Sequence, residues 1–437
     1  MYSNRKKNKA ELLAPAGNLE KMKTALAFGA DAVYAGIPDF SLRIRINDFD
    51  LKSLKEGIEY AHALHKKFYV TLNIFAHNQH LDKLPEYVKY LKTINPDGLI
   101  VSDPGIAQVI RKIWPKAELH LSTQANCTNW QAAKFWHTSG FERVVLGREV
   151  DIREIKEIKK RVPKLELETF IHGAMCMAYS GRCFLSKYLT NRSANLGDCI
   201  QPCRWKYDTK IQNNEFRIMN SNYYIKPEGR EEEFELVQEE HGSYILNSKD
   251  MCLIRRIPEM IEVGIDSFKI EGRAKSVYYL AQVVWAYRMA IDNTKDKNYK
   301  KISNKLFKEL NNKLVHRGYT EGFMFDEGEM AQNLENSHNL SEWEFCGQVV
   351  KSEKVKNGKF QNYIRVHNSL KVGDNLEILL PHKDVVKLKL KKILNIETAE
   401  EMNEAHGGQN KTVIIEAKEA WSEFGVLRRK IFQTKLV

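Results

Sequence analysis

The sequence lacks any long hydrophobic stretch. Hydrophobic residues make up 43% of its 437 residues, but no run approaches the roughly 20 apolar residues that span a bilayer. The basic N-terminus, MYSNRKKNKAELLAPAG, is followed by no apolar segment of the kind that directs secretion. We therefore expect a cytoplasmic protein with no membrane partner.

Cysteines are few, and acidic residues are outnumbered by basic ones. An odd number of cysteines, seven, without a secretory signal argues for a reducing compartment and against a disulfide framework. Lys and Arg number 68 against 56 Asp and Glu, which gives a formal net charge of +12. This excess fits either a general basic bias or a nucleic acid that is bound through its phosphates. Charge alone does not decide between the two.

Eight short, near-continuously apolar runs alternate with amphipathic segments along the chain. Such runs are typical of parallel strands that are buried on both faces, and the segments between them place Leu, Ala and Met opposite lysines at helical spacing. The pattern predicts an α/β fold, a (β/α)8 TIM-like barrel, with a doubly wound sheet as the alternative. The runs cover residues 11–17, 30–36, 68–74, 97–103, 118–124, 143–149, 165–173 and 267–273.

The regular spacing is interrupted once and ends before the C-terminus. Residues 174–266 form a long insertion between the seventh and eighth strands, within a barrel domain at 1–293. Residues 294–340 are polar and predict a helical linker. From 341 to 437, short alternating runs with Gly and Asn turns predict a small β-barrel domain.

One strand of this last domain carries three lysines on one face. They are Lys387, Lys389 and Lys391 in VVKLKLKKILNI. Lysines of this kind protect a solvated sheet edge against aggregation, and they equally suit an RNA-contacting face.

Four cysteines lie close together in the insertion. Cys176, Cys183, Cys199 and Cys203 form the pattern C-x6-C-x15-C-x3-C. Zinc sites use closely spaced pairs, so a zinc site fits only the last pair, whereas wide and uneven spacing is more typical of an iron–sulfur cluster. Buried cysteines without a metal are the alternative. A catalytic thiol beside His172 is a weaker interpretation, because a histidine four residues before a cysteine is no established dyad.

Polar side chains stand at the ends of the predicted strands, where a (β/α)8 barrel carries its chemistry. Two of them, Arg148 and Arg273, suit a carboxylate or phosphate through paired hydrogen bonds, and salt bridges to Glu149 and Glu271 are the alternative. The full set is Asn73, Asp103, Gln124, Arg148, Glu149, His172, Glu271 and Arg273. Arg43 and Arg45, on the loop after the second strand, are further candidates for binding an anion.

Several motifs together resemble one known family. They are ELLAPAGN, ADAVYAG, ETFIHGAMCMAYSGRCFLS, GDCIQPCRW, NSKDMCLI and FKIEGR. Over residues of about 10–330 they resemble the peptidase U32 family, the collagenase-like proteases, and the tail resembles the β-barrel of one subgroup. The sequence has neither an HExxH motif nor a Ser–His–Asp order, so it gives the peptidase name no mechanistic support.

The resemblance implies iron–sulfur proteins that hydroxylate RNA bases or quinone precursors without molecular oxygen. For the subgroup with this tail it implies hydroxylation of tRNA uridine at the wobble position, linked to prephenate, a small dicarboxylate. It implies a 4Fe-4S cluster on Cys176, Cys183 and Cys199, with Cys203 and Cys252 competing for the fourth place. We expect tRNA and no DNA as the partner, and peptidase activity is the alternative.

The candidate site residues follow from the strand ends and the motifs taken together. Our catalytic candidates are Glu168, His172, Arg148, Glu271 and Arg273. Our substrate-binding candidates are Arg43, Arg45, Asn73 and Gln124.

Overall fold

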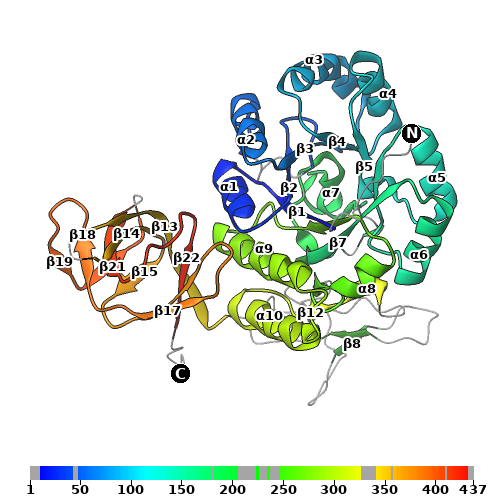
Figure 1. The fold of residues 1–437 in the computed structure, drawn as a ribbon. Helices are drawn as coiled ribbons and strands as arrows, with labels where there is room; N and C mark the ends of the chain where they lie inside the picture. The colour runs from blue at the N-terminus through cyan, green and yellow to red at the C-terminus, as the bar shows by residue number, and fades with distance from the viewer. Residues whose placement is uncertain are drawn as a thin grey trace, which may run out of the picture.

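The fold consists of a barrel domain and a smaller sheet domain beside it (Figure 1). The computed structural model describes residues 10–42, 48–176, 178–179, 182–204, 223–225, 234–236, 247–325, 341–355, 358–408 and 411–431. Arg43 and Arg45 lie outside the described residues. No helix within the described ranges is both long and apolar enough to cross a membrane.

Eight parallel strands close into a barrel, as the sequence predicted. Each strand pairs with the next along the chain, and the ring closes because β11 pairs with both β1 and β7: Ser267 stands opposite Glu11 on one side and Glu168 on the other. The strands are β1 Glu11–Pro15, β2 Ala32–Gly36, β3 Lys67–Leu72, β4 Gly98–Val101, β5 Leu119–Leu121, β6 Arg143–Val145, β7 Glu166–Ala174 and β11 Ser267–Ile270.

Helices surround the barrel, and their first residues explain where several of them begin. Asn18, Asp50, Asp103 and Asp151 each accept a hydrogen bond from a backbone N–H in the first turn of the helix that follows. Asp103, a strand-end candidate, is therefore a helix cap. The helices are α1 Leu19–Ala27, α2 Leu51–Ala63, α3 Asn78–Ile94, α4 Pro104–Ile113, α5 Trp130–Thr138, α6 Ile152–Arg161, α8 Ile257–Glu262 and α9 Val277–Asp292.

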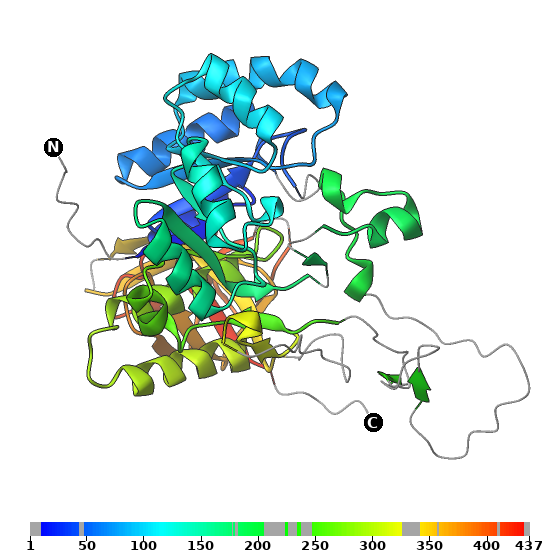
Figure 2. The ribbon, with the colours of Figure 1, turned by 90° about the vertical axis from the view of Figure 1, so that its right-hand side faces the viewer.

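The C-terminal part of the insertion packs against the barrel. Strand β10, Asp250–Cys252, lies antiparallel to β7 and parallel to β12, Tyr319–Thr320, and α8 then returns the chain to β11. The N-terminal part of the insertion contains α7, Leu185–Thr190, and two short 3-10 helices, Ala194–Leu196 and Pro202–Arg204. Figure 2 shows α7 standing off one end of the barrel. We call residues 175–204 the cysteine arm. Strands β8 Tyr223–Ile225 and β9 Phe234–Leu236 pair with each other.

The C-terminal domain is a curled antiparallel sheet, which corresponds to the predicted small β-barrel. Its strand order is β17-β16-β22-β13-β14-β21-β18-β19, and β15 pairs with β20. Lys387 and Lys389 are exposed on β17, at one end of this order, so they occupy a sheet edge. The strands are β13 Trp343–Lys354, β14 Phe360–Val366, β15 Ser369–Lys371, β16 Asn375–Leu379, β17 Val386–Lys389, β18 Ile393–Asn395, β19 Glu401–Met402, β20 Glu404–His406, β21 Thr412–Ala417 and β22 Val426–Lys430.

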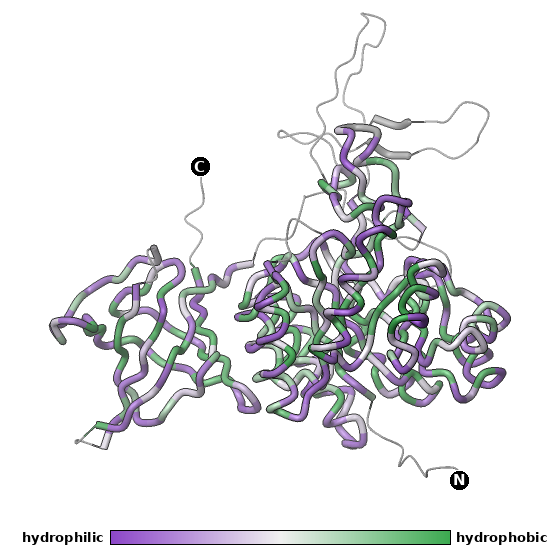
Figure 3. Tube along the Cα trace, turned by 90° about the horizontal axis from the view of Figure 1, so that it is seen from above, coloured by the Kyte–Doolittle hydropathy of each residue, from purple (hydrophilic) through white to green (hydrophobic). Residues whose placement is uncertain are grey.

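A buried charged cluster joins the two domains. Arg428 of β22 is fully buried and donates to Glu377 of β16 at 2.6 Å and to Glu309 at 2.7 Å. Glu309 belongs to α10, Tyr299–Lys313, which packs on α9. The sheet is therefore tied to the outer helices of the barrel, and Figure 3 shows the two domains side by side, each with its own hydrophobic stretches.

Candidate active site at the barrel mouth

A cavity of about 110 Å³ opens at the carboxyl ends of the barrel strands. Strand-end side chains meet at this end of a (β/α)8 barrel, and we call it the mouth. Five predicted residues line the cavity, namely Asn73, Gln124, Arg148, Glu271 and Arg273. Cys176 and Cys199 of the cysteine arm line it as well.

Three cations are part of the cavity lining, and we call them its cationic side: Arg148, Lys269 and Arg273. The guanidinium of Arg148 lies over the ring of Phe170, 4.0 Å from its centroid, and Arg273 donates to Ser41 Oγ at 3.0 Å and to the carbonyl oxygen of Leu42. Lys269 lines the cavity as well. Among the described lining residues, Glu271 is the carboxylate beside these three cations, so they suit an anionic ligand.

Lys269 is a site residue that the sequence analysis missed. It is 4% exposed, and its ammonium group lies 2.6 Å from Glu168 Oε1 and 4.4 Å from the ring centroid of Tyr34. We read its strand as apolar because Phe268 and Ile270 flank it. A charged residue within an otherwise apolar barrel strand was the signal that could have identified it, because such a charge needs a partner in the barrel interior.

Neutral polar side chains that follow β3 and β5 form another part of the lining, which we call the neutral side: Asn73, Ser122, Thr123 and Gln124. Asn73 is anchored at both ends of its amide, since Oδ1 accepts from Leu42 N at 3.3 Å and Nδ2 donates to Ser122 Oγ at 3.2 Å. Thr123 donates to the carbonyl oxygen of Leu146 at 3.1 Å. Gln124 differs from these neighbours, because its buried Oε1 has no hydrogen-bond partner among the described residues.

The cysteine arm is fixed over this neutral side by two contacts next to Cys183. Arg182 donates to the carbonyl oxygen of Gln124 at 3.0 Å. Asn195 accepts from Cys183 N through Oδ1 at 3.1 Å and from Phe75 N through its own carbonyl at 3.1 Å. The arm is thus attached to the loops after β3 and β5.

The thiols of the arm make separate local contacts. Cys199 Sγ accepts from Ser186 Oγ at 3.7 Å, and Cys183 Sγ accepts from Leu185 N at 3.4 Å. Cys203 lies on the 3-10 helix that contacts α7. In the part of the chain that the structure describes, no disulfide joins any of the seven cysteines, and no three His, Cys, Asp or Glu side chains are close enough together to hold a metal ion.

Cys252 lies apart from these thiols. It stands on β10 opposite His172, is 3% exposed and does not line the cavity. Burial raises the pKa of its thiol to about 11, and its sulfur accepts from the Tyr287 hydroxyl at 3.8 Å. A buried thiol with a raised pKa is a poorer source of thiolate than a half-exposed one.

Two catalytic candidates are buried away from the cavity. His172 is 1% exposed among Tyr279, Tyr287 and Tyr319, and burial lowers its pKa to about 3, so the ring is neutral at physiological pH. Glu168 is fully buried below Lys269. Neither side chain lines the cavity, so neither is placed to contact a ligand that binds there.

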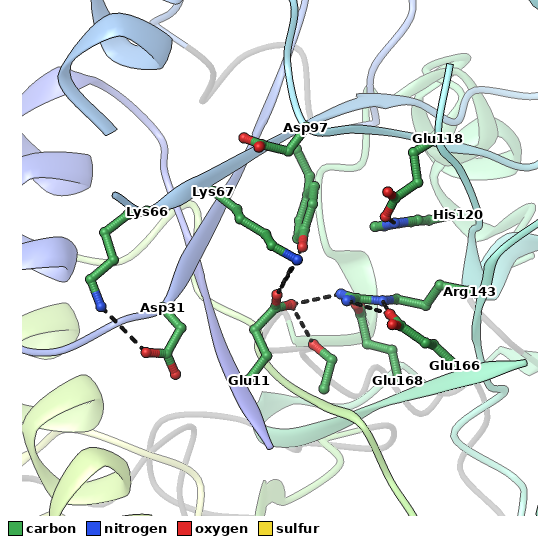
Figure 4. A network of polar contacts seen from close by, with 12 residues as sticks. Glu11, Asp31, Lys66, Lys67, Asp97, Glu118, His120, Arg143, Glu166 and Glu168 are labelled. Atoms are coloured by element: carbon green, nitrogen blue, oxygen red, sulfur yellow. Dashed lines mark hydrogen bonds and ion pairs between the residues drawn. The ribbon is translucent and has the colours of Figure 1, made fainter. Parts of the chain in front are cut away.

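A network of charged residues fills the barrel below the cavity (Figure 4). Arg143 stands at its centre and forms ion pairs with Glu11 at 2.6 Å, Glu166 at 2.8 Å and Glu168 at 3.0 Å. Burial alone would raise the pKa of Glu168, but its ion pairs with Lys269 and Arg143 lower this pKa to about 2. This network closes the barrel at the amino ends of its strands.

The fold and the site together describe a closed parallel barrel with a cationic cavity beneath a cysteine-bearing arm. The sequence profile of peptidase family U32 matches residues 17–333, and that of the U32 C-terminal domain matches residues 341–428. The chain therefore belongs to peptidase family U32.

Relatives of known name share most of the chain. It is 39% identical over 422 residues to tRNA hydroxylation protein P of Haemophilus influenzae, which covers 89% of both chains. It is 47% identical to tRNA hydroxylation protein P1 of Bacillus subtilis, over 65% of this chain and 63% of that one. It is 32% identical to the 23S rRNA 5-hydroxycytidine C2501 synthase of Escherichia coli, over 86% of this chain and 54% of that one.

Proposed function

We propose that this protein is an RNA-modifying enzyme that hydroxylates tRNA, forming 5-hydroxyuridine at the wobble position. The observation that carries the proposal is a single cavity lined by cysteine thiols, three cations and neutral amides. Relatives over nearly the full chain are named for tRNA hydroxylation, and a more distant one for hydroxycytidine synthesis in ribosomal RNA. Both names describe hydroxylation of a pyrimidine in RNA.

The donor set of the cysteine arm suits a 4Fe-4S cluster. Free thiols are soft ligands that iron–sulfur clusters use, and Cys176 and Cys199 already line the cavity. We assign Cys183 and Cys203 as the remaining ligands, because both belong to the same arm, whereas Cys252 is buried beside His172. Such a cluster would supply one-electron chemistry next to the bound base. Its binding requires the arm to bring its thiols together.

The cationic side of the cavity would bind the small dicarboxylate, for which prephenate is our candidate. Arg148 can offer paired N–H donors to a carboxylate, and Arg273 and Lys269 add positive charge to the same lining. Arg148 is the most available of the three, since no ion pair to a described carboxylate occupies it. The neutral side remains for the pyrimidine.

A base in folded tRNA has to leave its stack to reach a cavity inside a barrel mouth. The net charge of +12 provides a general attraction for the RNA backbone. Enclosure of the base by the arm would exclude water from the cavity. Free thiols and a tRNA substrate fit a cytoplasmic location.

The test combines protein chemistry with nucleoside analysis. Protein purified without air should be brown and contain iron and sulfide, and tRNA from a deletion strain should lack 5-hydroxyuridine derivatives. A plasmid-borne wild-type copy should restore them, and a Cys176→Ala copy should not. Normal levels of the nucleoside in the deletion strain, with no second pathway supplying it, would refute the proposal.

The fourth ligand and the peptidase alternative are separated by two further measurements. Cys203→Ala should lose the colour, while Cys252→Ala should keep it. Gelatin or casein should stay intact with the brown protein. Proteolysis that survives Cys199→Ala and Cys203→Ala would favour the peptidase.

A further inference from the structure

The neutral side of the cavity contains one polar group without a partner. Gln124 is 8% exposed, it lines the cavity, and its Oε1 is buried with no hydrogen-bond donor among the described residues. A buried acceptor left unpaired costs about 1–3 kcal/mol. Such a group in a native protein calls for a partner from outside the chain, either an ordered water or a ligand, and the place of Gln124 in the cavity lining favours a ligand.

The backbone of Gln124 is held firmly although its side-chain oxygen is free. Its N–H donates to Ser122 Oγ at 3.5 Å, and its carbonyl accepts from Arg182 at 3.0 Å. The next residues turn sharply, with Asn126 in the left-handed region at a φ of 56°. The amide is therefore presented to the cavity from a fixed loop, which is what recognition of a small rigid ligand requires.

Neighbouring side chains are already committed to structural contacts. The amide of Asn73 is bound to Leu42 N and Ser122 Oγ, and the hydroxyl of Thr123 is bound to Leu146. On the neutral side of the cavity, Gln124 thus offers the acceptor that a ligand can use.

We propose that Gln124 reads the imide edge of the target uracil, with Oε1 accepting from the ring N3–H. The amide can at the same time donate from Nε2 to an adjacent uracil carbonyl, because a glutamine amide matches a neighbouring donor and acceptor in one plane. This inference rests on the proposed function, and it makes Gln124 a specificity-determining residue.

The same contact links recognition to the cysteine arm. Arg182, which holds the carbonyl of Gln124, directly precedes Cys183, and its guanidinium also lies 5.5 Å from the ring centroid of Phe75. A base seated against Gln124 is therefore seated beside the arm that carries the thiols.

The experiment compares two anticodon stem-loop RNAs, one with uridine and one with N3-methyluridine at the target position. The methyl group removes the N3–H and leaves the carbonyl oxygens in place. Binding is measured by fluorescence anisotropy and turnover by nucleoside mass spectrometry, using brown protein under exclusion of air. The variants are Gln124→Ala and Gln124→Glu, and the control is Gln108→Ala, which removes an exposed glutamine on α4.

Wild type and Gln108→Ala should prefer the uridine RNA by about ten- to a hundredfold, the usual effect of leaving a buried polar group unpaired. Gln124→Ala should bind both RNAs with similar, weakened affinity. Gln124→Glu retains an acceptor and should keep part of the preference. Unchanged iron content and thermal midpoint would show that the variants are folded.

Two results would overturn the inference, and they are distinguishable. If wild type hydroxylates the uridine RNA and Gln124→Ala retains the full preference over N3-methyluridine, Gln124 does not read N3–H while the proposed function stands. If wild type hydroxylates neither RNA and binds both equally, the proposed function fails and the inference with it.

Discussion

The two ends of the barrel use buried polar residues in opposite ways. At the amino ends of the strands, Arg143 is surrounded by Glu11, Glu166 and Glu168, and its side chain is 3% exposed (Figure 4). At the mouth, Arg148 is stacked on an aromatic ring without a described carboxylate partner, and Gln124 has an unfilled acceptor.

This difference separates buried polar groups that stabilise the fold from polar groups that are available to bind a ligand. Buried ions are tolerated when partners surround them, and removing one partner leaves the rest uncompensated. Polar groups that stay unpaired beside a cavity reduce stability and are expected where a ligand completes them. Lys269 has features of both groups, because it lines the cavity and is also paired with Glu168.

The largest expected effect is at the mouth. Cys176→Ala should abolish 5-hydroxyuridine formation and the brown colour, because a cluster ligand that lines the cavity is lost. Iron analysis and absorption spectra of protein purified without air measure this. Cys127→Ala is the matched control: this cysteine is fully buried, and burial raises its pKa to about 12. Equal iron content in the two variants would contradict the assignment.

At the opposite end, Arg143→Met should reduce stability strongly without touching the cavity. Three carboxylates would lose their shared partner, and breaking a buried ion pair costs about 3–5 kcal/mol. Urea unfolding at pH 7 measures the free energy change. Lys67→Met removes an exposed lysine that lies 3.8 Å from Glu11, and it should cost less than about 1 kcal/mol. Similar losses for both variants would show that the network is not cooperative.

An intermediate effect is expected for Arg148. Arg148→Met should weaken dicarboxylate binding about tenfold, because one charged donor pair to the ligand is lost. Its stability should stay nearly unchanged, since no described carboxylate depends on it. Isothermal calorimetry with prephenate and a thermal melt give the two values. A large loss of stability with unchanged affinity would move Arg148 into the structural class.

The sequence predicted the barrel because buried parallel strands and amphipathic helices leave local patterns. Positions at strand ends, such as Asn73, Gln124 and Arg273, were predictable for the same reason: the mouth of a barrel follows from strand direction alone. The strand within the insertion was not predictable in this way. Strand β10 is three residues long and pairs with the distant β7, so no periodicity identifies it as part of the barrel wall.

Contacts between distant strands lay beyond the sequence. The pairing of Glu168 with Lys269 and Arg143 joins three strands, and it makes this catalytic candidate the buried counter-ion of two cations. The alternation of side chains between the two faces of β7 also does not predict the position of His172. A register shift between Lys269 and Ile270 interrupts the pairing of β11 with β7 at that level. The arm's attachment through Arg182 and Asn195 likewise depends on loops far apart in the chain.

The smallest expected effect is a pH dependence that arises from Glu168. Its pKa in the folded state is about 2, against an ordinary value of 4.5, so its ionised form is favoured by folding. The resulting stability is fully present above pH 4.5 and is lost as the pH falls from 4.5 towards 2. Burial also lowers the pKa of Lys269, the partner of Glu168.

The measurement is the difference in unfolding free energy between wild type and Glu168→Gln, taken at pH 7 and at pH 4. The glutamine variant cannot titrate at this position, so the difference should shrink by about 1 kcal/mol at pH 4. A difference that is constant between the two pH values would mean that folding does not shift the pKa of Glu168. In that case the charges below the cavity would be less tightly coupled than their distances imply, and the contrast between the two ends of the barrel would weaken.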